Sequence, residues 1–172
     1  IESSYLRLLS ILDDILQQSE FLFGGRPAAA DFAIYGQLTQ LGIIEPTSAA
    51  LMSEISPRLR AWIDRLDDLS GHQVIEGTGW DARDVVIKRL GSLLAEIGHV
   101  YLPFLAANAM AVQEGKDRFE AEIDGRPWVQ PTFPYQAKCL MALRDGLQKL
   151  TSSEQNELKA IFASDAEGAL FA

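Results

Sequence analysis

Few side chains in this sequence could act as nucleophiles or metal ligands. Cys139 is the only cysteine, and His72 and His99 are the only histidines. The neighbouring Lys138 could lower the pKa of the Cys139 thiol, but a lone cysteine is more often a small buried apolar residue. Two histidines without carboxylates at ligand spacing do not indicate a zinc site. We therefore expect no catalytic residue and no metal site in this chain.

A set of aromatic and amide residues is better suited to binding. Its members are Tyr101, Phe104, Asn108, Trp128 and Tyr135. The first three recur at roughly helical spacing, close to Pro103, which cannot donate to the His99 carbonyl and should kink or split the helix. Aromatic rings with one amide suit an apolar ligand that carries one polar group. The alternative is that all five are core residues whose polar ends are bonded within the protein.

The periodicity of the apolar residues predicts an all-α fold that would position this set. Helices are predicted over residues 4–19, 28–41, 56–70, 81–113, 134–150 and 152–163. We expect the very apolar helix 28–41 in the middle of the core, and a kink or a helix boundary near Tyr101. Alternating residues and the pair Asp124-Gly125 predict a small β-hairpin at about 119–130. The result is a bundle of five to seven helices with that hairpin.

Composition narrows the possible partners. The 172 residues carry a formal net charge of −9, and no basic cluster is present, so we expect no nucleic-acid partner. Apolar runs are interrupted before about 18 residues, so we expect no membrane-spanning segment. The single cysteine and the lack of a signal-peptide pattern favour the cytoplasm. Because the chain starts at Ile1 without methionine, we expect that this is not the natural start of the protein.

One segment carries a family resemblance. Between Phe21 and Leu38 the chain has a glycine turn, Pro27, an Ala-Asp pair ending at Asp31, and an apolar helix; Pro57, Leu59, Trp62 and Leu66 then follow at helical spacing. Together these features cover residues 1–70 and resemble the C-terminal helical domain of the glutathione transferases. The run from Trp128 to Leu140 resembles the tail of an extended branch of glutathione-transferase-like proteins.

Asp31 lies where a carboxylate stabilises the start of a helix. Free backbone N–H groups and the positive end of the helix dipole favour an acid there. If Ala28 is the N-cap, Asp31 can accept a hydrogen bond from the Ala28 N–H as one arm of a capping box. The related family usually has Ser or Thr at the position of Ala28, so the hydroxyl arm is missing here. We expect Asp31 to be a structural helix cap and not a catalytic acid.

The resemblance implies a division of labour between two domains. In the glutathione transferases, a thioredoxin-like N-terminal domain binds glutathione and supplies the residue that favours its thiolate, while the helical domain supplies much of the electrophile pocket. This chain would then be a single helical domain, with a core at 1–70, an extension at 71–172 and no thioredoxin-like part.

The predicted function follows from that division. The chain would be the electrophile-binding and structural half of a glutathione-transferase-like protein, inactive by itself. Glutathione would be the co-substrate of the larger protein, and the thioredoxin-like domain would be the partner of this chain. The alternative is a non-catalytic interaction or assembly module, because fold does not fix function. A homodimer remains open.

Overall fold

The computed structural model describes residues 2–162 and 168–171 of the chain. Contacts divide the chain into two compact units, which we call the N-terminal unit (Ile1–Leu93) and the C-terminal unit (Leu94–Ala172). A single domain with a core at 1–70 and an extension at 71–172 was expected from the sequence. The N-terminal unit extends further because the loop before residue 83 folds back: the Asp81 N–H donates to the Phe23 carbonyl at 2.9 Å.

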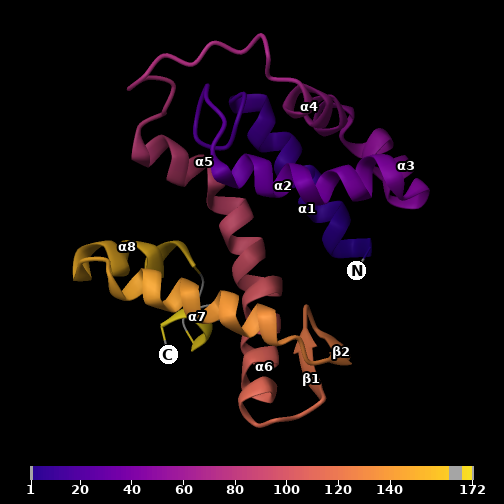
Figure 1. Ribbon diagram of the computed structural model, residues 1–172, viewed down its shortest axis with the longest axis vertical. Coiled ribbons are helices and arrows are strands. Elements are labelled where there is room, and N and C mark those ends of the chain that lie inside the picture. The colour runs from indigo at the N-terminus through magenta and orange to yellow at the C-terminus, as the bar shows by residue number, and fades with distance from the viewer. Residues whose placement is uncertain (1, 163–167, 172) are drawn as a thin grey trace. The chain divides into compact units, whose positions relative to one another are not determined.

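The N-terminal unit is helical (Figure 1). Its elements are α1 (Glu2–Gln18), α2 (Ala29–Thr39), the π-helical turn η1 (Gln40–Ile44), α3 (Pro46–Ile55), α4 (Pro57–Asp67) and most of α5 (Arg83–Glu96). The helix α4 begins as its sequence predicts, with the Ser56 side chain accepting a hydrogen bond from the Leu59 N–H at 3.1 Å and with Pro57 in the first turn.

The helix α3 was not predicted. From the sequence, helices were predicted over 28–41 and 56–70, and no element was assigned to the residues between them. In the structure, Glu45 caps a new helix by accepting a hydrogen bond from the Ser48 N–H at 2.6 Å, and Pro46 occupies its first turn. Gly42 leaves room for the Met52 side chain, since a Cβ atom there would lie 2.5 Å from the Met52 sulfur and the side chain would have to shift.

The core of the N-terminal unit comes mainly from the apolar stripes of α1 and α4, with single residues from the turn after α1, from α2 and from α3. Its fully buried members include Leu9, Leu12, Ile15, Phe21, Leu38, Met52, Leu59 and Ile63. The expectation that the helix at 28–41 lies in the middle of the core is wrong. Within α2 only Asp31 and Leu38 are buried, and 47 % of Phe32 is exposed. A helix that is apolar on all sides therefore leaves part of its surface uncovered.

Besides the end of α5, the named elements in the described part of the C-terminal unit are a π-helical turn, three α-helices and a hairpin. They are η2 (Ile97–Tyr101), α6 (Leu102–Gln113), β1 (Arg118–Ile123), β2 (Arg126–Pro131), α7 (Pro134–Gln148) and α8 (Ser152–Ile161). Near Tyr101, where a kink or a helix boundary was expected, η2 ends and the helical backbone continues into α6, with Pro103 in the first turn of α6. Leu102, Leu105, Leu140, Ala169 and Leu170 form the core.

The hairpin predicted at about 119–130 is confirmed. β1 and β2 pair antiparallel with Ile123 opposite Arg126 and Arg118 opposite Pro131. Asp124 and Gly125 form the two-residue turn with positive φ angles of 54° and 68°, as a turn matched to strand twist requires. The all-α class with a small hairpin is therefore confirmed. The described residues hold one more helix than the predicted range because α3 was missed.

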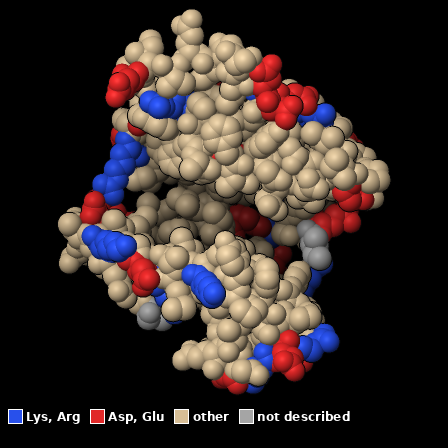
Figure 2. All heavy atoms as spheres, viewed as in Figure 1, with Lys and Arg blue, Asp and Glu red and all other residues tan. Residues whose placement is uncertain are grey.

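Charge and hydropathy complete the description. At the lower end of the view in Figure 2, where Figure 1 places the end of α6 and the start of β1, acidic and basic side chains occur close together. Among the described residues, one helical stretch, Arg83–Gln113, is long and apolar enough to cross a membrane. Core helices of soluble proteins also pass this test, so it is weak evidence for a membrane span.

Candidate functional site

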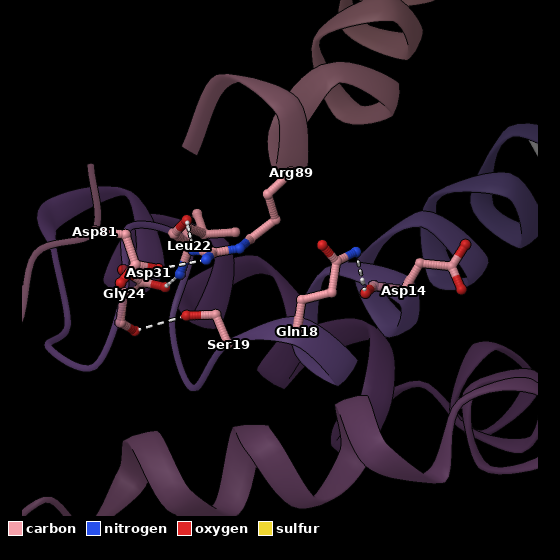
Figure 3. Close-up of polar contacts among 8 residues, drawn as sticks. All are labelled: Asp14, Gln18, Ser19, Leu22, Gly24, Asp31, Asp81 and Arg89. Carbon is pink, nitrogen blue, oxygen red and sulfur yellow. Dashed lines mark hydrogen bonds and ion pairs between the residues drawn. The ribbon is translucent and has the colours of Figure 1, made fainter. Parts of the chain in front are cut away.

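The start of α2 is organised around the Asp31 carboxylate. Asp31 Oδ2 accepts from the Ala28 N–H at 2.8 Å, and Oδ1 accepts from the Leu22 N–H at 2.9 Å (Figure 3 draws the Leu22 bond). Ala28 offers no side-chain acceptor, so only the carboxylate arm of a capping box exists here. The Asp31 side chain is completely buried. The cap interaction is local, whereas the bond to Leu22 also ties the preceding turn to the helix.

Two opposing effects act on the pKa of Asp31. Burial raises the pKa of its carboxyl group, because ionisation in a poorly hydrated place is unfavourable. The N–H groups of Leu22 and Ala28 lower the pKa, since they stabilise the ionised form. Burial is the larger effect, so the pKa is raised. Both oxygens are occupied and no part of the side chain reaches solvent, so Asp31 cannot contact a substrate.

Arg89 of α5 belongs to the same network and was missed by the sequence analysis. Its guanidinium donates to the Leu22 carbonyl at 3.3 Å and forms an ion pair with Asp81 (Figure 3). Only 5 % of the Arg89 side chain is exposed, and its buried Nε atom has no hydrogen-bond partner among the described residues. Leu22 is therefore held at both backbone groups, by Asp31 at its N–H and by Arg89 at its carbonyl.

The turn that contains Leu22 is also held by backbone contacts. Gly24 has a φ of 136°, and a Cβ atom there would lie 2.5 Å from the Gly79 carbonyl oxygen, so only glycine fits. The Ser19 hydroxyl donates to the Gly24 carbonyl at 3.0 Å. Together with Asp31 and Arg89, these contacts fix the geometry of the turn. The arrangement is that of a structural clamp.

In the C-terminal unit the structure brings together three of the five residues expected to bind a ligand. The Tyr101 and Phe104 rings stack with centroids 6.3 Å apart, and Trp128 meets Phe104 edge-on at 6.1 Å. Phe119, which the sequence analysis did not include, also meets Phe104 edge-on at 5.4 Å. Tyr101 is 44 % exposed. These rings form an aromatic cluster with one accessible edge.

The other two residues of the set lie elsewhere. The completely buried Asn108 donates to the Phe133 carbonyl at 3.0 Å and accepts from the Phe133 N–H at 2.8 Å. The Asn108 amide is thus bonded within the protein. Its partner is Phe133 and not the His99 carbonyl, to which Pro103 cannot donate. Tyr135 is 67 % exposed and contacts Phe133, with ring centroids 6.3 Å apart. Asn108 therefore anchors the start of α7.

Two of the cavities among the described residues have volumes of several hundred Å³. One of about 450 Å³ in the N-terminal unit is lined by residues of α1, the following turn and α4, including Glu20, Trp62 and Arg65. The other, of about 570 Å³, lies between α6 and β1 and is lined by Ala106, Ala107, Met110, Ala111, Glu114, Lys116, Arg118, Phe119 and Glu120. None of the five residues of the expected set lines either cavity.

The cysteine and the histidines are dispersed. His99 bonds to the Asp124 carboxylate at 3.0 Å, and His72 meets the edge of Phe21 at 5.4 Å. Cys139 is half-buried on α7. The pKa of the Tyr101 hydroxyl is raised, first by the burial of Tyr101 itself and second by the negative charge that Cys139 carries as a thiolate. Among the described residues no group of three His, Cys, Asp or Glu side chains could hold a metal ion.

The network around Asp31 begins in a part of the chain that matches a known protein family. Residues 1–65 match the family model described as glutathione S-transferase, C-terminal domain. This part of the chain is a glutathione S-transferase C-terminal-like domain. No curated protein and no solved structure matches the chain.

The boundaries of the glutathione S-transferase C-terminal-like domain divide the clamp around Leu22. Asp31, Ala28 and Leu22 lie inside the matched region, whereas Asp81 and Arg89 lie beyond it. The matched region ends within α4, so the whole C-terminal unit also lies beyond it. The domain therefore depends on a later helix for the second half of its clamp.

Proposed function

We propose that this chain is the helical, electrophile-binding and structural half of a glutathione-transferase-like protein, and that it does not catalyse conjugation by itself. The observation that carries the proposal is the family match over residues 1–65, with Asp31 buried at its helix start. The larger protein would supply a thioredoxin-like domain and glutathione. A domain of this kind suggests a soluble protein, and we propose the cytoplasm as its location.

The aromatic cluster of the C-terminal unit is the proposed electrophile site. Tyr101 exposes almost half of its surface and stacks on Phe104, which Trp128 in turn meets edge-on. Flat apolar electrophiles stack on such rings. The contribution to the reaction would be positioning and exclusion of water, with thiolate attack carried out by glutathione bound elsewhere. Asn108 would position α7 beside the cluster through Phe133.

Two measurements test this proposal. The purified chain, mixed with glutathione and an aromatic halide, should give no turnover above the uncatalysed rate; turnover would overturn the claim of inactivity. For binding, a variant with Trp62→Phe and Trp80→Phe keeps Trp128 as the only tryptophan. Its fluorescence should be quenched saturably by a nitroaromatic glutathione conjugate. A matched Trp128→Phe variant should show no saturable quenching. Quenching that is confined to Trp62 and Trp80 would contradict the proposed site.

An assembly module is the second candidate, and one feature favours it. On α2 and η1 the apolar residues Phe32, Ile43 and Ile44 are 47 %, 46 % and 67 % exposed. Exposed apolar surface of this kind is typical of a site that binds a protein partner. The residues encoded upstream of Ile1 separate the two candidates. A thioredoxin-like segment with a Cys, Ser or Tyr near its first helix favours the transferase half, and its absence favours the module.

A further inference from the structure

The hairpin of the C-terminal unit has two outer strand edges without a strand partner among the described residues. Ile123 and Arg126 flank the two-residue turn, so they form a hydrogen-bonded pair, and such pairs recur at every second residue. The bond from the Thr132 N–H to the Asp117 carbonyl, 2.9 Å long, continues the same alternation. The backbone groups of residues 118, 120 and 122 on β1 therefore point away from β2.

The two edges differ in sequence. On β2 the residues whose backbone points outward are Pro127, Val129 and Pro131. Two of these three have no N–H, which protects an edge against a further strand. On β1 all three outward residues, at 118, 120 and 122, keep their N–H groups. The outer edge of β1 is thus the edge that can accept another strand.

The charges beside this edge have a self-complementary order. Two bases, Lys116 and Arg118, precede two acids, Glu120 and Glu122, and alternate residues share one face of a strand. In a second, antiparallel copy aligned with Phe119 opposite Phe119, each Arg118 faces a Glu120 and each Lys116 faces a Glu122. Opposite charges across a strand pair stabilise it, and like charges destabilise it.

The charges are only partly engaged within one chain. Lys116 forms an ion pair with Glu114 at 2.6 Å. In the part of the chain that the structure describes, no ion pair engages Arg118, Glu120 or Glu122. The two Arg118–Glu120 pairs would therefore form without breaking an existing ion pair. In the two Lys116–Glu122 pairs, Lys116 would exchange Glu114 of its own chain for Glu122 of the other copy. The outer face of β1 has three exposed charged side chains available for a partner.

A cavity whose α6 wall is largely apolar lies beside the outer edge of β1. The cavity of about 570 Å³ runs between α6 and the residues at 118–120. Phe119 is fixed on the inner face of the hairpin by Phe104, and α6 contacts β1. Ala106 and Ala107 contribute only methyl groups to the wall, and Met110 is 62 % exposed on it. A second chain can therefore approach closely along α6.

We propose that two copies of this chain associate through the outer edge of β1. The two hairpins then form one four-stranded sheet in the order β2, β1, β1, β2 around a two-fold axis, and each copy covers the cavity wall of the other. The interface is isologous, with the same residues on both sides. This association does not depend on the proposed electrophile site.

The first experiment blocks the edge. Analytical ultracentrifugation of the full chain should show a dimer that weakens as salt concentration rises, because the pairs are exposed to solvent. Glu120→Pro removes an outward N–H without touching the pairing to β2, and should weaken the dimer by at least about tenfold. The matched control is Val129→Pro, which alters the outer edge of β2 and should leave the dimer unchanged. Circular dichroism checks that both variants are folded.

The second experiment exchanges charges. A variant with Lys116→Glu and Arg118→Glu has four acids at these positions, and a variant with Glu120→Lys and Glu122→Lys has four bases. Each alone should be monomeric where the wild type is dimeric, and an equimolar mixture should form heterodimers. Three results would overturn the proposal: a monomeric wild-type chain, variants that remain monomeric when mixed, or a dimer that all variants retain. The last result would place the interface elsewhere.

Discussion

Asp31 in the N-terminal unit and Asn108 in the C-terminal unit are both completely buried polar side chains that hold backbone. Asp31 accepts from two N–H groups, of Leu22 and Ala28, while Asn108 accepts from and donates to one residue, Phe133. A carboxylate only accepts, whereas an amide does both. The donors and acceptors that face a buried position therefore decide which of these two similarly shaped side chains fits there.

Exchanging the amide for a carboxylate in the C-terminal unit should have the largest effect. Asn108→Asp places a carboxylate oxygen against the Phe133 carbonyl oxygen and buries a charge. We expect a loss of roughly 3–5 kcal/mol in the free energy of unfolding at neutral pH. At low pH the protonated carboxyl group can donate to that carbonyl, so stability should partly recover. Urea unfolding at several pH values measures both effects.

The control for this exchange is Asn156→Asp on the exposed side of α8. Its charge is solvated, so its unfolding free energy should stay within about 0.5 kcal/mol of wild type. If Asn108→Asp were equally mild, the bonds to Phe133 would not stabilise the fold, and the comparison with Asp31 would fail.

Removing the carboxylate in the N-terminal unit should have the next largest effect. Asp31→Ala leaves the N–H groups of Leu22 and Ala28 without their acceptor. Each unsatisfied buried donor costs about 1–3 kcal/mol, and the Ala28 N–H is only partly buried, so we expect a total loss of roughly 2–4 kcal/mol. Thermal unfolding compares this variant with Asp14→Ala, whose side chain is exposed on α1. Equal melting temperatures for the two variants would show that the clamp around Leu22 is dispensable.

The converse exchange, Asp31→Asn, should cost less and should change the pH dependence. One N–H group keeps an acceptor and the other faces an amide NH₂, so we expect a loss of about 1–3 kcal/mol at neutral pH. Burial raises the pKa of Asp31 above its value in the unfolded chain, which is about 3.9.

The sign of the pH effect follows from that direction. As pH rises above about 3.9, the unfolded chain loses this proton first, so ionisation favours unfolding until the folded pKa is passed. The stability advantage of wild type over Asp31→Asn should therefore shrink over this range. Urea unfolding across acidic pH tests it, and an advantage that grew with pH would show that the N–H bonds outweigh burial.

Contacts between residues close in the sequence were predicted, whereas contacts between distant residues were not. The bond between Asp31 and Ala28 spans three residues and belongs to a helix-start pattern, and the Asp124-Gly125 turn is equally local. The bond from Asn108 to Phe133 spans 25 residues, and that from Arg89 to Leu22 spans 67. Periodicity places residues on a helix face but cannot tell which distant backbone group meets that face.

The same limit explains the errors in the helices. The helix α2 is apolar enough for a core position, yet Phe32 is largely exposed because burial depends on what packs beside it. The helix α3 was missed because its cap is Glu45, which is a less common cap residue than Ser or Asp, and because Pro46 resembles a helix end as much as a beginning.

The smallest predicted effect concerns the missing arm of the capping box at α2. Within this chain α8 has a complete box: Thr151 accepts from the Glu154 N–H at 3.4 Å, and Glu154 accepts from the Thr151 N–H at 2.8 Å. Ala28→Ser would supply the same hydroxyl at α2. The Asp31 N–H, however, already donates to the Ala28 carbonyl at 3.0 Å.

The new hydroxyl would therefore improve an existing bond and not satisfy a free donor. We expect a gain of only about 0.5 kcal/mol, at the lower end of N-cap effects. Thr151→Ala at the complete box is the matched variant and should lose more, about 1 kcal/mol, because its hydroxyl is the existing acceptor. Urea unfolding of both variants decides the point. A gain at Ala28 larger than the loss at Thr151 would mean that the carboxylate arm alone leaves the start of α2 poorly capped, which its two short bonds to Asp31 argue against.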